Sequence, residues 1–243
     1  MSFPGGGVPG GATAACTSCL ANGDPADILC EDCENADAEW CTPVATDFDG
    51  TNSVSVVNVA AGLACTDKGN KALQFVADGG QGESFGNSYT ASSDTYYFHG
   101  YLYVSELTID TSTRLAIMEI WDTGVGYTLS FDIYHDGVSP KFSIFVITYG
   151  PETDLVIGGA VSTSTWYEVE IYWTKDTTNG AWFRIDGGTT YTMDDDEKTE
   201  NVTPEYINIG STVASSNFAA GDTVTLQWDI IEVDNNTMPG SCP

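Results

Sequence analysis

The stretch STSTWYEVEIYWTKDTTNGAWFRIDGG, residues Ser162–Gly188, decides the fold. Apolar and polar side chains alternate over Trp166–Trp173 and again over Ala181–Ile185, with the polar sequence KDTTNG between them. A period of two residues is typical of a β-strand with one buried face, and clustered Asp, Asn and Gly residues are typical of a turn. The stretch therefore predicts two antiparallel strands. Their expected core side consists of Tyr167, Val169, Ile171, Trp173, Phe183 and Ile185.

The same alternation recurs in Tyr96–Ser105, Gly126–Asp136 and Val224–Asn235. Turn sequences such as DTGVG and HDGVSP separate these runs, and no run of ten or more residues carries a helical apolar stripe. The pattern predicts an all-β fold with two antiparallel sheets, packed as a sandwich or jelly roll. In the last segment the expected core side is Val224, Leu226, Trp228 and Ile230.

Four segments also carry a family pattern in their order and spacing. They are ILCEDCENADAEW (Ile28–Trp40), GNKALQF (Gly69–Phe75), the stretch Ser162–Gly188 and LQWDIIEVDN (Leu226–Asn235). Together they resemble the opening, second, middle and closing strands of a laminin-G-like, concanavalin A-like jelly roll. The resemblance implies that the first and last strands are neighbours. Relatives of this kind serve as carbohydrate-binding or adhesion modules and as parts of phage tail or capsid proteins, and some are glucanases.

The N-terminal residues differ from the rest of the chain. Residues 1–27 are rich in Gly, Pro, Ala and Asp without a strand or helix period, so we expect an irregular arm before a jelly-roll domain at residues 28–243. The first residues lack the basic and apolar regions of a secretory signal peptide. No apolar run approaches the ~18 residues of a membrane span. We therefore expect synthesis in a host cytoplasm and a location on a virion, or outside the cell after release.

The charge of the chain is strongly acidic. Its 35 Asp and Glu residues against 7 Lys and Arg residues give a formal net charge of −28. Such a protein repels nucleic acid and anionic membranes, so neither is an expected partner. The charge favours divalent cations, cationic partners or plain solubility.

The predicted outer sides of several strands combine aromatic and charged residues. Aromatic rings stack on the apolar faces of sugars, and polar groups orient the sugar hydroxyls. The same composition also suits contact with a neighbouring protein. The predicted carbohydrate or partner face comprises Tyr97, His99, Tyr101, Tyr103, Asp132, Tyr134, Glu168, Glu170, Tyr172, Trp182 and Arg184.

Catalytic patterns are weak. Glucanases of this fold carry two carboxylates on one strand in a pattern like E-x-D-x-x-E, and the nearest match is MEIWDTG. Its Glu119 and Asp122 are three positions apart and are expected on opposite sides of a strand. Glu168 and Glu170 share a side, with Cα atoms about 6.5–7 Å apart. We nevertheless predict no catalytic residue and no enzymatic activity, with a glycoside hydrolase using Glu168 and Glu170 as the less favoured alternative.

The cysteines allow two interpretations. Cys16, Cys19, Cys30 and Cys33 have the C-x2-C-x10-C-x2-C spacing of a zinc site, but their flanks are acidic. A strand through ILCEDCE would also turn Cys30 and Cys33 to opposite sides. We therefore expect disulfides in preference to zinc. The other disulfide candidates are Cys41, Cys65 and Cys242.

A second metal hypothesis concerns MDDDEKTE, residues Met193–Glu200. Calcium binds six to eight converging oxygen ligands, but adjacent acidic residues are usually a solvated turn. We expect that no cofactor is required, and zinc and calcium remain alternatives.

These observations lead to one preferred functional hypothesis. We expect a non-enzymatic structural or adhesion protein, displayed on a phage particle as a capsid decoration or tail-associated domain. Its expected partners are other virion proteins or copies of itself, and cell-surface glycans are a further candidate. The alternative is a secreted, lectin-like module that binds carbohydrate.

Overall fold

The computed structural model describes residues 29–31, 53–62, 71–78, 86–88, 94–122, 126–147, 153–175, 180–193, 206–212, 221–235 and 238. Over these residues the backbone forms β-strands joined by turns and bends, and no helix is long and apolar enough to cross a membrane. The predicted all-β jelly-roll sandwich is confirmed.

The larger sheet has eight strands in the order β12-β11-β10-β5-β14-β3-β2, with β1 paired to β14 as well. All of the pairings in this sheet are antiparallel. The pairing of β1 with β14 agrees with the expected neighbourhood of the first and last strands. The strands are β1 (Leu29–Glu31), β2 (Ser53–Asn58), β3 (Lys71–Asp78), β5 (Thr95–Thr108), β10 (Thr165–Thr174), β11 (Ala181–Ile185), β12 (Thr190–Thr192) and β14 (Thr223–Asp234).

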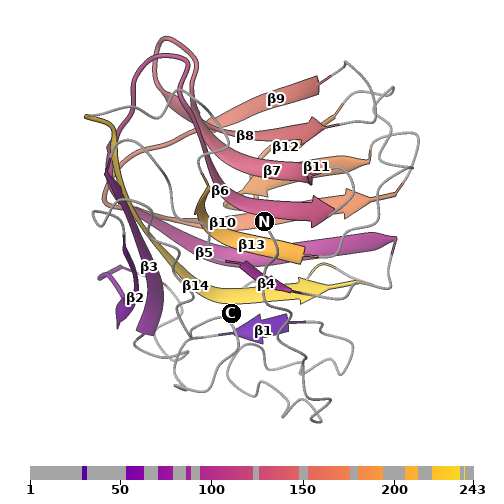
Figure 1. Ribbon diagram of the computed structural model, residues 1–243, viewed down its shortest axis with the longest axis horizontal. Helices are drawn as coiled ribbons and strands as arrows, with labels where there is room; N and C mark the ends of the chain where they lie inside the picture. Colours follow the sequence, from indigo (N-terminus) through magenta and orange to yellow (C-terminus); the bar gives the residue numbers. More distant parts are fainter. Residues whose placement is uncertain are drawn as a thin grey trace.

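The smaller sheet has six antiparallel strands in the order β4-β13-β6-β7-β8-β9. In Figure 1 its strands β6–β9 lie in front of β10–β12 of the larger sheet. The strands are β4 (Gly86–Ser88), β6 (Arg114–Asp122), β7 (Gly126–His135), β8 (Pro140–Ile147), β9 (Thr153–Ala160) and β13 (Tyr206–Thr212).

Aromatic side chains fill the space between the sheets. Phe131 of β7 stacks on Phe142 of β8 at 5.4 Å between ring centroids and lies 5.6 Å from Phe183 of β11 in the opposite sheet. Trp228 of β14 meets the edge of Phe98 at 5.5 Å. Burying such rings is the main source of stability in a sandwich. The predicted core sides of Ser162–Gly188 are confirmed, because all six residues belong to the core or pack against it.

The predicted core side of β14 is correct up to Trp228 and wrong at Ile230. Between Asp229 and Glu232 the register shifts, so that Ile230 and Ile231 both lie opposite Gly100. This β-bulge gives Ile230 a φ of 50° and turns its side chain to the outer side, where it packs with Tyr101. Ile231 then takes the core position. Strict alternation cannot anticipate an inserted residue.

One edge of the sandwich depends on a glycine. Gly158 of β9 lies opposite Phe142, on the core side, and the ring of Tyr191 from β12 packs directly on its backbone. Tyr191 in turn stacks on Phe183 at 4.9 Å. The pair joins the two sheets at this edge.

Substitution Gly158→Ala should therefore destabilise the protein, because the added Cβ would overlap the Tyr191 ring. We expect the free energy of unfolding to fall by roughly 1–3 kcal/mol, the usual cost of overpacking. Urea unfolding followed by tryptophan fluorescence measures it. Ala160→Ser, at an exposed position of the same strand, is the control and should change stability little. If Gly158→Ala had the same free energy of unfolding as the native protein, the close packing of Tyr191 on Gly158 would be contradicted.

Candidate functional site

The structure gathers nine of the eleven predicted face residues on one surface. They come from β5, β10 and β11 and lie on the outer side of the eight-stranded sheet, away from the core. The other two, Asp132 and Tyr134, are on β7 of the six-stranded sheet. Alternation tells on which side of its own strand a residue lies, but it does not tell to which sheet that strand belongs. The outer face of the larger sheet is called the polar–aromatic face below.

Strand register arranges this face in rows. Tyr97 and Trp182 both lie opposite Tyr172, in a row across β5, β10 and β11. The next row joins His99, Glu170 and Arg184. Beyond it, Glu168 lies opposite Tyr101, and Trp166 lies opposite Tyr103. Charged groups therefore occupy the middle, and aromatic side chains occupy both ends.

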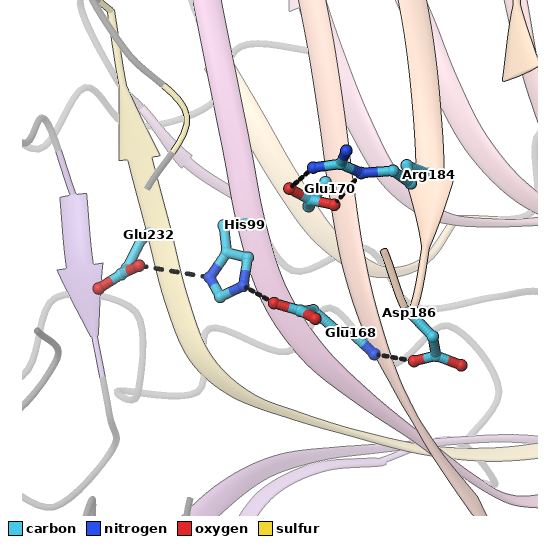
Figure 2. Close-up of polar contacts among 6 residues, drawn as sticks. All are labelled: His99, Glu168, Glu170, Arg184, Asp186 and Glu232. Carbon is cyan, nitrogen blue, oxygen red and sulfur yellow. Dashed lines mark hydrogen bonds and ion pairs between the residues drawn. The ribbon is translucent and has the colours of Figure 1, made fainter. Parts of the chain in front are cut away.

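His99 is held between two carboxylates (Figure 2). Its Nε2 lies 3.0 Å from Oε1 of Glu168, and its Nδ1 lies 3.3 Å from Oε2 of Glu232. Burial lowers the pKa of the ring, but the two carboxylates outweigh this and raise it to about 9. The imidazole is therefore positively charged at neutral pH.

Glu168 is the end of this network that reaches solvent. Its side chain is 19% exposed, whereas those of His99 and Glu232 are 1% and 0% exposed. The backbone N–H of Glu168 donates to Oδ1 of Asp186 at 2.8 Å, and the N–H of Asp186 donates to the Glu168 carbonyl at 2.9 Å. Asp186 has a φ of 51° and begins the turn that ends β11. Glu168 is thus fixed by its side chain and by its backbone.

Arg184 is paired with Glu170 in the neighbouring strand (Figure 2). The Nε and Nη2 groups of Arg184 donate to the two carboxylate oxygens of Glu170. These hydrogen bonds raise the pKa of Arg184 further above its usual value. Bidentate pairing uses the planar edge with which an arginine normally recognises a carboxylate.

The aromatic residues form two groups. Tyr97 and Tyr172 lie 5.0 Å apart between centroids, and Trp182 stacks on Tyr172 at 5.6 Å. At the other end Tyr103 and Trp166 lie 5.2 Å apart. All five side chains are partly exposed.

Val59 and Ala60, which follow β2, pack on the polar–aromatic face near Trp166. The indole N–H of Trp166 donates to the Ala60 carbonyl at 3.2 Å, and Val59 packs beside it against the Tyr101–Ile230 pair.

Sequence reasoning missed the contribution of β14. Asp229, Glu232 and Asp234 lie opposite Tyr101, His99 and Tyr97, so they belong to the same face. Glu232 reaches this position only because of the bulge. The two adjacent isoleucines in DIIEVD, which interrupt the alternation, were the one available signal.

The six-stranded sheet carries a separate polar cluster on its outer side. Ser130 donates a hydrogen bond to Asp132, and Arg114 lies 3.4 Å from the same carboxylate. Burial raises the pKa of Asp132 to about 6, although Arg114 and Ser130 act in the opposite direction. Glu119 lies opposite Ser130 and Ser143 lies opposite Asp132. All four of Glu119, Ser130, Asp132 and Ser143 are at most 1% exposed, so solvent does not reach them.

The metal and disulfide predictions stay predictions. Of the seven cysteines only the backbone of Cys30, in β1, is described, and the acidic run Asp194–Glu197 also lies outside the described residues. Where the structure does describe side chains, it shows no group of three or more His, Cys, Asp or Glu residues placed to hold a metal ion.

Comparison with solved structures finds similar β-sandwich folds at low sequence identity. No protein-family model and no curated protein sequence matches the chain. The chain is similar to the carbohydrate esterase vb_24B_21 from the Shiga toxin-encoding bacteriophage phi24B, with a TM-score of 0.55, 13% identity and coverage of 87% of this chain and 99% of that one. It is also similar to the cellulose-induced protein Cip1, with a TM-score of 0.54, 16% identity and coverage of 82% and 93%.

A third similar structure is a mutant of the alginate lyase Aly36B in complex with an alginate trisaccharide, with a TM-score of 0.52, 14% identity and coverage of 71% and 83%. At these identities the likeness shows the jelly-roll fold, and a laminin-G-like subtype is not specifically shown. The prediction of a protein without enzymatic activity is contradicted, because the similar structures include alginate lyases and a carbohydrate esterase.

The charge on His99 should make stability depend on pH. Folding raises the pKa of His99 from 6.5 to about 9, so the folded state binds the proton more tightly. The resulting stabilisation is complete below pH 6.5 and is lost as the pH rises through about 9. This pKa difference corresponds to roughly 3 kcal/mol.

Urea unfolding at several pH values measures this effect, with His99→Gln as the comparison. The difference in unfolding free energy between the two proteins should shrink as the pH rises from 6.5 to 9. In the native protein, NMR should show one of the two histidine rings titrating near pH 9. If the difference in unfolding free energy did not depend on pH and no histidine ring titrated near pH 9, the pairing of His99 with Glu168 and Glu232 would be contradicted.

Proposed function

We propose that the protein is a carbohydrate-active enzyme that binds a polysaccharide on its polar–aromatic face, with Glu168 taking part in cleaving the chain. The fold supports the general class, since similar structures include a carbohydrate esterase and an alginate lyase with a bound oligosaccharide. The observation that carries the proposal for this chain is the Glu232–His99–Glu168 network, which is buried at one end and open at the other.

The two outer faces of the sandwich differ in how far solvent reaches their polar side chains. Two carboxylates of the six-stranded sheet, Glu119 and Asp132, are out of reach of solvent, and so of a polysaccharide. On the polar–aromatic face Glu168 and the rings of Tyr172 and Trp182 are partly exposed. A sugar chain could therefore contact an aromatic group and a carboxylate on the same surface.

Glu168 has the features expected of a group that transfers a proton. Its position is fixed by His99 on the side-chain end and by Asp186 on the backbone, and a fixed position is what catalysis requires. Glu170, the other carboxylate considered from the sequence, is paired with Arg184 and its side chain is 5% exposed, whereas that of Glu168 is 19% exposed. Glu168 is therefore preferred over Glu170 as the catalytic residue.

The virion location stays a prediction, as do the expected protein partners. Similarity to a phage-encoded esterase is compatible with that location. An enzyme of this kind on a particle would act on polysaccharides at the surface of a host cell.

Substitution Glu168→Gln should reduce cleavage by about 10²-fold or more while binding changes little, because it removes proton transfer but keeps the shape of the side chain. Release of reducing ends from a panel of soluble polysaccharides measures cleavage. Glu106→Gln, an exposed site of β5, is the matched control and should behave like the native protein. Full activity of Glu168→Gln would show that Glu168 is not catalytic, and inactivity of the native protein on every polysaccharide would remove the enzymatic proposal.

Substitution Trp182→Ala should weaken polysaccharide binding by roughly tenfold, because a ring contact of about 1 kcal/mol or more is lost. Calorimetry or affinity electrophoresis measures the change. Val138→Ser is a suitable control, since Val138 is 87% exposed on the turn that joins β7 and β8 of the other sheet. Equal binding by Trp182→Ala and native protein would place the sugar elsewhere.

A further inference from the structure

The charges on the polar–aromatic face are strongly unequal. Two cations, His99 and Arg184, are contributed by the described strands of this face. Carboxylates outnumber them, and they come from β10, from β14 and from the turn after β11. Around His99 and Arg184 they are Glu168, Glu170, Asp186, Asp229, Glu232 and Asp234, and Glu106 lies on the same face near the end of β5.

Both cations are already paired with carboxylates. Arg184 is 36% exposed, but its Nε and Nη2 groups donate to Glu170, so this carboxylate compensates its charge. His99 is 1% exposed and lies between two carboxylates, so its positive charge is already compensated inside the protein. A sugar carboxylate placed on this face would meet more acidic groups than cations, and both cations are already paired with carboxylates.

The field of the face is therefore negative. The pKa of Tyr97 agrees with a negative field. It is raised mainly by burial, and also by Tyr172 and the carboxylate of Asp234. The net charge of −28 over the whole chain acts in the same direction. A polyuronate such as alginate would be repelled by both.

We infer that the polysaccharide bound by this face is uncharged, an inference that rests on the proposed function. Neutral sugars offer hydroxyl donors, which carboxylates accept strongly, and apolar ring faces, which suit Tyr172 and Trp182. The similar alginate lyase binds an alginate trisaccharide, so this chain would share its fold but differ in substrate class.

Whether the polysaccharide is charged also decides how its glycosidic bond can be cleaved. Lyases cleave a uronate by elimination, because the sugar carboxylate makes the neighbouring C–H acidic, and a neutral sugar has no such group. Cleavage here is hydrolysis. The glycosidic C–O bond breaks, the leaving oxygen takes a proton, and the oxygen of a water molecule bonds to the anomeric carbon as its own proton departs. Glu168, a carboxylate beside the protonated His99, accepts the proton that leaves the water, and the leaving oxygen takes its proton from solvent.

Binding of neutral polysaccharides and of alginate by the native protein is the primary test. Glucan, xylan, mannan and alginate are compared by affinity electrophoresis and calorimetry at low and high salt. We expect binding to at least one neutral polymer with little effect of salt, at least tenfold weaker binding to alginate, and new reducing ends without unsaturated sugar products. Preferred binding of alginate, or unsaturated products, would overturn the inference and leave the proposed function standing. Binding of neither class would remove both.

Substitution Glu170→Gln tests whether the pairing of Arg184 with Glu170 is what weakens alginate binding. It releases the guanidinium of Arg184, and alginate binding should rise at least tenfold at low salt and fall again at high salt. Glu106→Gln removes the same charge away from Arg184 and should bring no such gain. No gain in a folded Glu170→Gln variant would also overturn the inference. If that variant does not fold, the polymer preference and salt response of the native protein decide the question.

Discussion

One inserted residue in β14 organises both sides of the eight-stranded sheet. At the bulge opposite Gly100, Ile230 turns outward and Ile231 and Val233 continue the core. Gly100 also lies in contact with the ring of Trp228, where a Cβ would be close to the indole. Without the bulge, the residues that follow would exchange sides, and Glu232 would enter the apolar core instead of meeting His99.

The position of Glu232 in turn determines the electrostatics of the polar–aromatic face. A buried histidine without partners would lose its proton, whereas one between two carboxylates keeps it. The charge of His99 then orients Glu168, whose side chain is the accessible end of the network. The Arg184–Glu170 pair beside it is neutral as a unit. The face thus contains two cations whose charges are compensated by carboxylates of the same face.

The two sheets use polar residues in different ways. In the six-stranded sheet, Asp132 and Glu119 are buried on the outer side, and burial raises the pKa of Asp132. In the eight-stranded sheet, the polar residues change from buried on β14 to partly exposed at Glu168 of β10 and Arg184 of β11. A polysaccharide needs an accessible surface, so this gradient distinguishes the faces better than composition does.

Local sequence by itself determined the strands and the side of each strand on which residues lie. The core positions of Tyr167, Val169 and Phe183 were predictable, because successive side chains on a strand point to opposite sides. The nine face residues on β5, β10 and β11 could be selected in the same way. The side chosen for Ile230 was wrong, since an inserted residue reverses the alternation at a point that the local pattern does not mark clearly.

Only the tertiary structure decided which strands are neighbours. It separated Asp132 and Tyr134 from the nine residues of the larger sheet, and it joined His99 to Glu232, far away in the sequence. These choices depend on backbone pairing between distant strands and on packing across the core. Side-chain alternation is a property of one strand, whereas a site shared by three strands is a property of their pairing.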